Sequence, residues 1–170
     1  MYLTCPTEQY LPSYIAAGAE YRAAGVETYH FIDPAEHDVL GWIHTLETGE
    51  GLDGKYIRST YLWLVDGEKF IAELTVRHSL TASLRQRGGH IGYGVRPGYW
   101  GCGIGTRLLA MGLDWIRVNL PDMDKTLVTC HDDNLASARV IEKNGGVLED
   151  IIEYEGQQTR RYWIEVRGKR

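Results

Sequence analysis

The sequence predicts a single domain, residues 1–170, of the α+β (mixed α/β) class, with a central mixed and mostly antiparallel sheet flanked by helices. Residues 1–55 place apolar side chains at helical spacing. Residues 60–95 contain three segments rich in β-forming residues with short connections, which is typical of antiparallel strands. Beyond residue 100, helical and strand patterns alternate, which indicates a parallel crossover. A chain of 170 residues has the length of one domain.

Two helices are predicted before the sheet. Glu8–Ala24 has apolar residues on one helical face, and Pro12 restricts where that helix begins. Residues 33–36 (Asp-Pro-Ala-Glu) combine a capping Asp, a Pro at the first helical position and a Glu three residues after the cap. We therefore expect a second helix from this point to Gly49 or Gly51.

The middle of the chain changes to strand periodicity. Thr60–Val65 and Lys69–His78 flank Asp66-Gly67, a strong hairpin turn. A polar connection, Ser79–Gly88, leads to a third strand at His90–Val95. These segments predict an antiparallel meander.

The last third of the chain alternates helices and strands. After a loop at 96–105, a helix is expected from Thr106 to about Asn119, followed by a buried strand and a helix that ends at Gly145-Gly146. A final hairpin turns around Glu155-Gly156-Gln157. The remaining expected elements are strand Lys125–Cys130, helix Asn134–Lys143 and the hairpin strands Val147–Tyr154 and Arg160–Val166.

Composition excludes several classes of protein. The chain carries 18 Lys and Arg against 23 Asp and Glu, a net charge of −5, which argues against a nucleic-acid partner. The cysteines, Cys5, Cys102 and Cys130, show neither a disulfide framework nor metal-ligand spacing. We therefore expect no metal and a reducing, cytoplasmic location. No apolar run has the roughly 18 residues of a membrane helix, and the first residues do not resemble a signal peptide.

A glycine-rich loop is the most informative segment. Gly101, Gly103 and Gly105 precede a predicted helix, whose free N–H groups and dipole attract anions such as phosphate. A nucleotide-triphosphate loop would end in Gly-Lys-Ser/Thr, but here Gly105 is followed by Thr106 and Arg107. Thr106 also stands where a dinucleotide-binding fingerprint needs its third glycine.

A third interpretation fits the loop. The run from Ile91 to Leu109 resembles the coenzyme A loop of the GCN5-related N-acetyltransferases (GNAT family). A second block, Thr129–Val147, is similar to that family's later strand and helix, with Asn134, Ser137 and a Lys-x-Gly ending at Gly145. The two blocks occur in the family's order, and the resemblance covers about residues 60–166, the expected cofactor-binding core.

The resemblance implies an enzyme that moves an acetyl group from acetyl-CoA directly to a primary amine within a ternary complex. A backbone N–H near Val95 would stabilise the oxyanion. Trp100, Cys102 and Ile141 depart from the family pattern, and Ile141 replaces a frequent Tyr acid. The residues implied to bind the cofactor are Tyr93, Val95, Trp100, Gly101, Cys102, Gly103, Ile104, Gly105, Thr106, Asn134 and Ser137.

The catalytic groups are less well defined. His90 opens a strand where relatives often have Glu, and a cross-strand pairing would bring His78 beside it, so both are candidate bases. Tyr154 is the candidate acid, with Tyr162 as an alternative. Glu73 points either to the same cleft or to solvent. Cys130 is interpreted as a buried strand residue. Arg85 and Arg87 lie either in a charged surface loop or facing an acidic substrate.

Two other functions stay open. A catalytically weak CoA-binding sensor would share the loop and Asn134, and only turnover separates it from an enzyme. A structural domain without cofactor would not bind CoA at all. The acceptor is a small-molecule or peptide amine, and no motif specifies it further. A homodimer is also left open by the sequence.

Overall fold

The computed structural model describes residues 1–26, 32–33, 37–50, 52 and 56–167. Among these residues, strands form one sheet in the order β1-β2-β3-β4-β5-β7-β6. Neighbouring strands are antiparallel except β4 and β5, which are parallel. The predicted fold class is confirmed. The strands are β1 (Tyr2–Thr4), β2 (Ser59–Asp66), β3 (Lys69–Arg77), β4 (Ile91–Val95), β5 (Lys125–His131), β6 (Val147–Tyr154) and β7 (Gln157–Glu165), and the helices are α1 (Leu11–Ala23), α2 (Val39–Thr48), α3 (Ala82–Gln86), α4 (Ile104–Asn119) and α5 (Leu135–Lys143).

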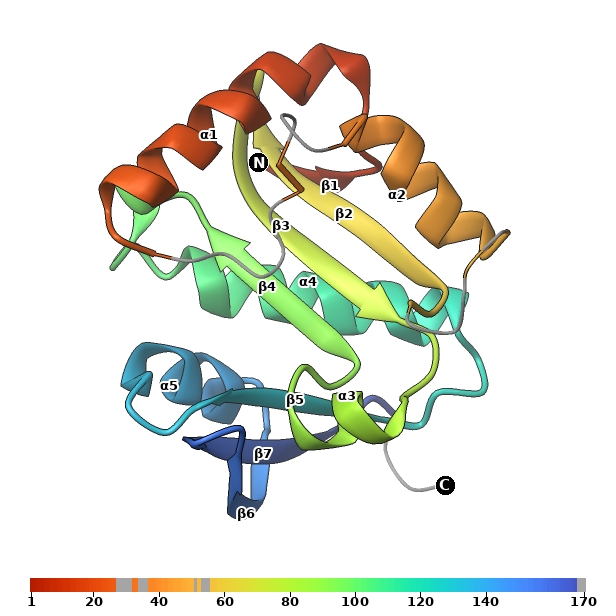
Figure 1. The fold of residues 1–170 in the computed structure, drawn as a ribbon, viewed down its shortest axis with the longest axis vertical. Helices are drawn as coiled ribbons and strands as arrows, with labels where there is room; N and C mark the ends of the chain where they lie inside the picture. Colours follow the sequence, from red (N-terminus) through yellow and green to blue (C-terminus); the bar gives the residue numbers. More distant parts are fainter. Residues whose placement is uncertain (27–31, 34–36, 51, 53–55, 168–170) are drawn as a thin grey trace.

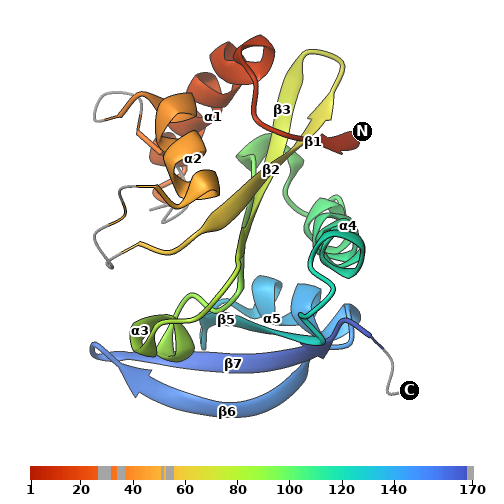
Figure 2. The ribbon, with the colours of Figure 1, turned by 90° about the vertical axis from the view of Figure 1, so that its right-hand side faces the viewer.

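Helices cover both faces of the sheet. Figure 2 shows α1 and α2 on one side of β2 and β3, and α4 on the other. Alternation along the strands supplies both cores: Leu62 packs in the cluster under α4, whereas its neighbour Trp63 packs under α1 and α2. The Trp63 ring stacks on Tyr14 of α1 with the ring centroids 4.5 Å apart. Each such buried side chain contributes about 1.5–3 kcal/mol.

The β5–β7–β6 half of the sheet turns away from the β1–β4 half (Figure 2). The parallel pair β4–β5 is the joint between the halves (Figure 1). This joint matters for function because the glycine-rich loop connects β4 to α4.

Several predicted boundaries need correction at the N-terminal side. Residues 34–36 of the expected capping box lie outside the described residues, and α2 begins only at Val39, because Asp38 still has extended backbone angles. Strand β1 was not expected, since it has only three residues and pairs with the distant Trp63–Val65. The connection 79–88 contains α3, whose first turn is capped by the Thr81 hydroxyl, which accepts from the Leu84 N–H.

The later boundaries differ less. Helix α4 begins at Ile104 instead of Thr106, because Gly103 already takes the left-handed conformation that precedes the first turn. Strand β7 begins at Gln157 because Glu155 and Gly156, both with positive φ, form a two-residue turn.

Candidate active site

Strand β4 is joined to β5 only at its first residue, which lies beside the middle of β5. Ile91 pairs with Val128, and the His90 N–H donates to the Leu127 carbonyl oxygen at 2.7 Å. Beyond this joint no further residues pair between the two strands. Gly89 allows the close approach: its φ is +62°, and a Cβ there would overlap the Leu127 carbonyl oxygen. The strands therefore separate towards Val95, beside the glycine-rich loop.

The loop leads into the first turn of helix α4, whose N–H groups have no acceptor within the helix. Gly101 and Gly103 have φ values of +74° and +76°, and a Cβ at either position would meet no atom within 4 Å. Backbone conformation, and not crowding, thus requires glycine here. The free N–H groups of the first turn of α4 make a site for an anion.

Two loop side chains turn back on the loop itself. The Trp100 indole N–H donates to the Val95 carbonyl oxygen at 2.5 Å. The exposed Cys102 thiol contacts the Trp100 carbonyl oxygen at 3.5 Å. The Trp100 indole thus provides a hydrogen-bond donor for the Val95 carbonyl oxygen, at the end of β4 that is separated from β5.

Helix α5 contributes polar groups across from β4. The Asn134 side chain accepts a hydrogen bond from the Ser137 N–H at 3.0 Å and so caps the helix. The Ser137 hydroxyl lies 2.8 Å from the Tyr93 hydroxyl of β4. Cys130 of β5 is buried, as expected of a strand residue, and burial raises the pKa of its thiol to about 11.

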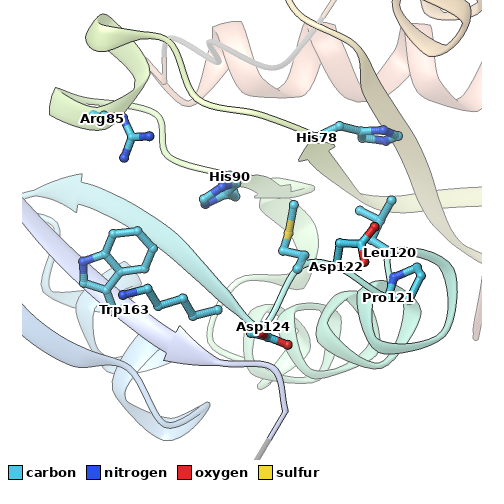
Figure 3. Close-up of a pocket in the computed structure, with 10 residues that line it drawn as sticks. His78, Arg85, His90, Leu120, Pro121, Asp122, Asp124 and Trp163 are labelled. Atoms are coloured by element: carbon cyan, nitrogen blue, oxygen red, sulfur yellow. The ribbon is translucent and has the colours of Figure 1, made fainter.

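The two histidines lie at the other end of β4, where a cleft of about 540 Å³ opens (Figure 3). His78 and His90 both line it, so the expected proximity is present. The Leu127 N–H donates to His90 Nδ1 at 2.9 Å, which leaves the proton of a neutral ring on Nε2. Burial, with Arg85 and Arg77 nearby, lowers the His90 pKa to about 4.

His78 is bound differently. Its Nε2 lies 2.9 Å from the Thr60 hydroxyl. Burial, together with Arg58, lowers its pKa. Both rings are therefore neutral near pH 7, and both already have a polar partner.

The tyrosines expected as acids are held elsewhere. The Tyr154 hydroxyl lies 3.0 Å from the Ser83 hydroxyl of α3, and Tyr162 donates to Glu142. Ile141 is fully buried in the core, so α5 offers no hydroxyl at that position.

Glu73 is the residue that sequence reasoning could not place. It is buried, at 4% exposure, on the face under α1, and so points neither to solvent nor into the cleft of Figure 3. The Trp63 indole N–H donates to its Oε2 at 2.8 Å. Burial raises its pKa to about 8. Glu73 pairs directly with Gly94 of β4, so its carboxyl lies beside the part of β4 that faces the separated β5.

Within the described ranges, no three His, Cys, Asp or Glu side chains gather as metal ligands. None of the helices in the described part of the chain is long and apolar enough to cross a membrane.

The comparisons agree with this geometry. A family model described as an acetyltransferase (GNAT) domain matches residues 5–147. The chain belongs to the GNAT acetyltransferase family. As a GNAT protein it is an acetyl-CoA-dependent N-acetyltransferase, which confirms the predicted family and enzyme class. No curated protein sequence matches this chain.

Solved structures share the GNAT fold. A ribosomal-protein-S5-alanine acetyltransferase from Vibrio fischeri is 15% identical, with a TM-score of 0.71 over 96% of this chain and 91% of that one. RimL, a ribosomal L7/L12 α-N-protein acetyltransferase in a disulfide-linked complex with coenzyme A, is 17% identical, with a TM-score of 0.71 over 96% and 92%. A variant of the spermidine N-acetyltransferase SpeG from Vibrio cholerae is 16% identical, with a TM-score of 0.67 over 98% and 95%.

Proposed function

We propose that the protein transfers the acetyl group of acetyl-CoA directly to a primary amine in a ternary complex, with no acetylated enzyme. The observation that carries this proposal is the joint of β4 and β5, which ends after Ile91 and opens beside the N-terminus of α4. The pyrophosphate binds the loop N–H groups of 101–106, and the pantetheine arm lies between the separated strands. The thioester then lies beside β4 between the joint and Val95, with Asn134, Ser137 and Tyr93 along the arm.

The reaction balances without a metal or redox partner. The neutral amine nitrogen attacks the thioester carbonyl carbon, and the oxyanion accepts from a β4 backbone N–H near Val95. The C–S bond then breaks, the amine proton passes to a base, and the thiolate takes a proton. The products are the acetamide and free CoA.

We assign the base role to Glu73. Glu73 lies across from Gly94, where β4 carries no side chain and the Tyr21 hydroxyl is the nearest group to the position of a Cβ. A pKa of about 8 suits a group that must hold the amine proton near neutral pH. His90 carries its proton on the free nitrogen, so its geometry favours donation over proton uptake.

Two hydroxyls are candidates for protonating the thiolate. Tyr93 stands on β4 beside the strand separation and is held by Ser137. Tyr154 is held by Ser83 and stacks under the Arg87 guanidinium, 5.3 Å from the ring centroid. We favour Tyr93 because it lies on the strand that borders the separation.

Release of free thiol from acetyl-CoA tests the proposal. A panel of peptide N-termini, lysine, polyamines, aminoglycosides and small amines should include at least one acceptor that gives saturable, enzyme-dependent thiol release. The panel includes peptides and polyamines because the structurally similar enzymes are named as acetyltransferases of a ribosomal protein and of spermidine.

The alternative is a CoA-binding sensor. The Trp100 indole on the Val95 carbonyl and the buried Ile141 favour it, because both lie where substrate or acid would act. Saturable acetyl-CoA binding without thiol release from any acceptor would select the sensor.

The exposed Cys102 provides a test of where the cofactor binds. We expect saturating acetyl-CoA to slow alkylation of Cys102 about tenfold or more, because the pyrophosphate would cover its loop. Cys5 is also exposed and lies outside the loop, so its alkylation should not change. The rates are measured by peptide mass spectrometry, and equal slowing or no slowing at the two cysteines would contradict the assignment.

A further inference from the structure

The cleft in Figure 3 has a built-in charge arrangement that acetyl transfer alone does not require. Arg85, His90 and Trp163 lie on one side of it, and Asp122 and Asp124 lie on the other, in the connection from α4 to β5. It opens at the opposite end of β4 from the glycine-rich loop, so it is separate from the site of the cofactor phosphates.

Arg85 and Arg87, the two arginines considered in the sequence analysis, have different surroundings in the structure. Arg87 pairs with Glu155 at 2.6 Å and stacks on Tyr154, so it serves the β6–β7 hairpin. Arg85 lines the cleft, and no carboxylate of the described residues lies within ion-pair distance of its guanidinium. Its backbone carbonyl oxygen accepts from Arg161, and its backbone N–H donates to the Thr81 carbonyl oxygen.

The surroundings of Arg85 add positive charge and a donor. The Arg77 guanidinium lies near enough to His90 to lower its pKa, and it donates to the carbonyl oxygens of Gly88 and Gly89. It forms no ion pair with a carboxylate of the described residues. His90 offers its Nε2–H, because Nδ1 accepts from Leu127. This side of the cleft therefore attracts an anion.

The other charged side chains that line the cleft are Lys125, Asp124 and Asp122. The Lys125 ammonium lies 4.5 Å from the Trp163 ring centroid. Asp124 lies 3.8 Å from Arg167. Asp122 lies on the opposite wall from Arg85, so the cleft is not uniformly basic.

We propose that Arg85, with the His90 Nε2–H, binds a carboxylate carried by the acceptor amine. This inference rests on the proposed function, which places the thioester beside β4 between the Ile91–Val128 joint and Val95. His90 precedes Ile91, and a strand rises about 3.3 Å per residue, so the cleft begins within about 7 Å of the joint. The assigned base lies across from Gly94, four residues or about 13 Å along the strand from His90, so an acceptor reaches both Arg85 and the thioester only when its carboxylate and amine are about that far apart. A polyamine would instead place a second ammonium against Arg85.

The test compares matched acceptors. Amino acids and amino carboxylic acids of increasing length are each assayed against the corresponding amide, with spermidine as the polycation. We expect kcat/KM about tenfold or more higher for the best carboxylate than for its amide, the range of a charge-assisted hydrogen bond. Arg85→Gln should remove this preference by raising KM, with acetyl-CoA affinity unchanged. Arg87→Gln, two residues away, is the matched control and should retain it.

Other outcomes overturn the proposal. These are equal rates for acid and amide, a preference that survives Arg85→Gln, or a preference for spermidine that Asp122→Asn removes. Calorimetry of the amino carboxylates in the presence of CoA gives a readout without turnover, and equal binding by wild type and Arg85→Gln also overturns the proposal. Thiol release without carboxylate preference would leave the acetyltransferase function intact. Carboxylate binding at Arg85 without thiol release would instead contradict the proposed function.

Discussion

Glu73→Gln is expected to reduce kcat at least about 100-fold while making the fold more stable at alkaline pH. The loss of activity follows from removal of the assigned base, since general base catalysis contributes about 10²–10⁴-fold. The gain in stability follows from burial. The folded pKa of Glu73 is raised to about 8 from an ordinary value of 4.5, so its contribution to stability is fully present below pH 4.5 and is lost as the pH rises through 8.

Denaturant unfolding at several pH values measures this effect. At pH 4.5 the variant and the wild type should differ by no more than about 1 kcal/mol, because Gln still accepts from Trp63. Above pH 8 the variant should be more stable by about a few kcal/mol, since one pKa unit corresponds to about 1.4 kcal/mol. Thr75→Val, two residues along the same face of β3, removes no charge and should show no such pH dependence. A stability difference that is flat with pH contradicts the burial account, and unchanged turnover removes Glu73 from the base role.

Gly89→Ala is expected to destabilise the protein by about 3 kcal/mol or more. The new Cβ would overlap the backbone carbonyl oxygen of Leu127, which accepts the His90 N–H. Left-handed backbone adds about 1 kcal/mol of strain, and the overlap forces β4 and β5 apart at about 1–3 kcal/mol. Calorimetric melting should show a decrease in Tm of about 6–12 °C. Because the joint positions the strand separation, the affinity for acetyl-CoA should fall as well.

Gly67→Ala is the matched control for that substitution. Gly67 has φ +57°, and a Cβ at this position would meet no atom within 4 Å. It therefore carries the backbone strain without the overlap, and about 1 kcal/mol of destabilisation is expected. If both variants lose the same stability, the close approach at Gly89 does not set the β4–β5 joint.

Local patterns predicted most of the fold. The β-rich runs around Asp66-Gly67 indicated β2 and β3, and the helical patterns from Thr106 to about Asn119 and over Asn134–Lys143 indicated α4 and α5. Strand β1 was missed because three residues carry no periodicity, and it forms only by pairing with a strand about sixty residues away. The family was predictable because both of its blocks are contiguous in sequence.

The chemistry of the site was less predictable because it depends on tertiary contacts. A strand places Glu73 on one of two faces, and the sequence does not say which face lies under α1. The His90 ring is limited by a hydrogen bond from Leu127, 37 residues away. Arg85 and Arg87 look equivalent in sequence, yet only Arg87 meets Glu155. The available sequence signal for Glu73 was an acidic residue within an otherwise apolar strand, followed by Gly-x-Gly at residues 92–94 in the next strand.

Calorimetric titration of acetyl-CoA into wild type and Gly103→Pro tests the central claim, that the loop before α4 holds the cofactor. Gly103 has φ +76°, which proline cannot adopt, and proline also removes an N–H. Gly103→Ala keeps the N–H and meets no atom within 4 Å, so it controls for backbone strain. We predict saturable one-site binding by wild type, modest weakening in Gly103→Ala, and at least about 100-fold weakening in Gly103→Pro that remains folded by circular dichroism. Equal affinity in wild type and folded Gly103→Pro would contradict the claim.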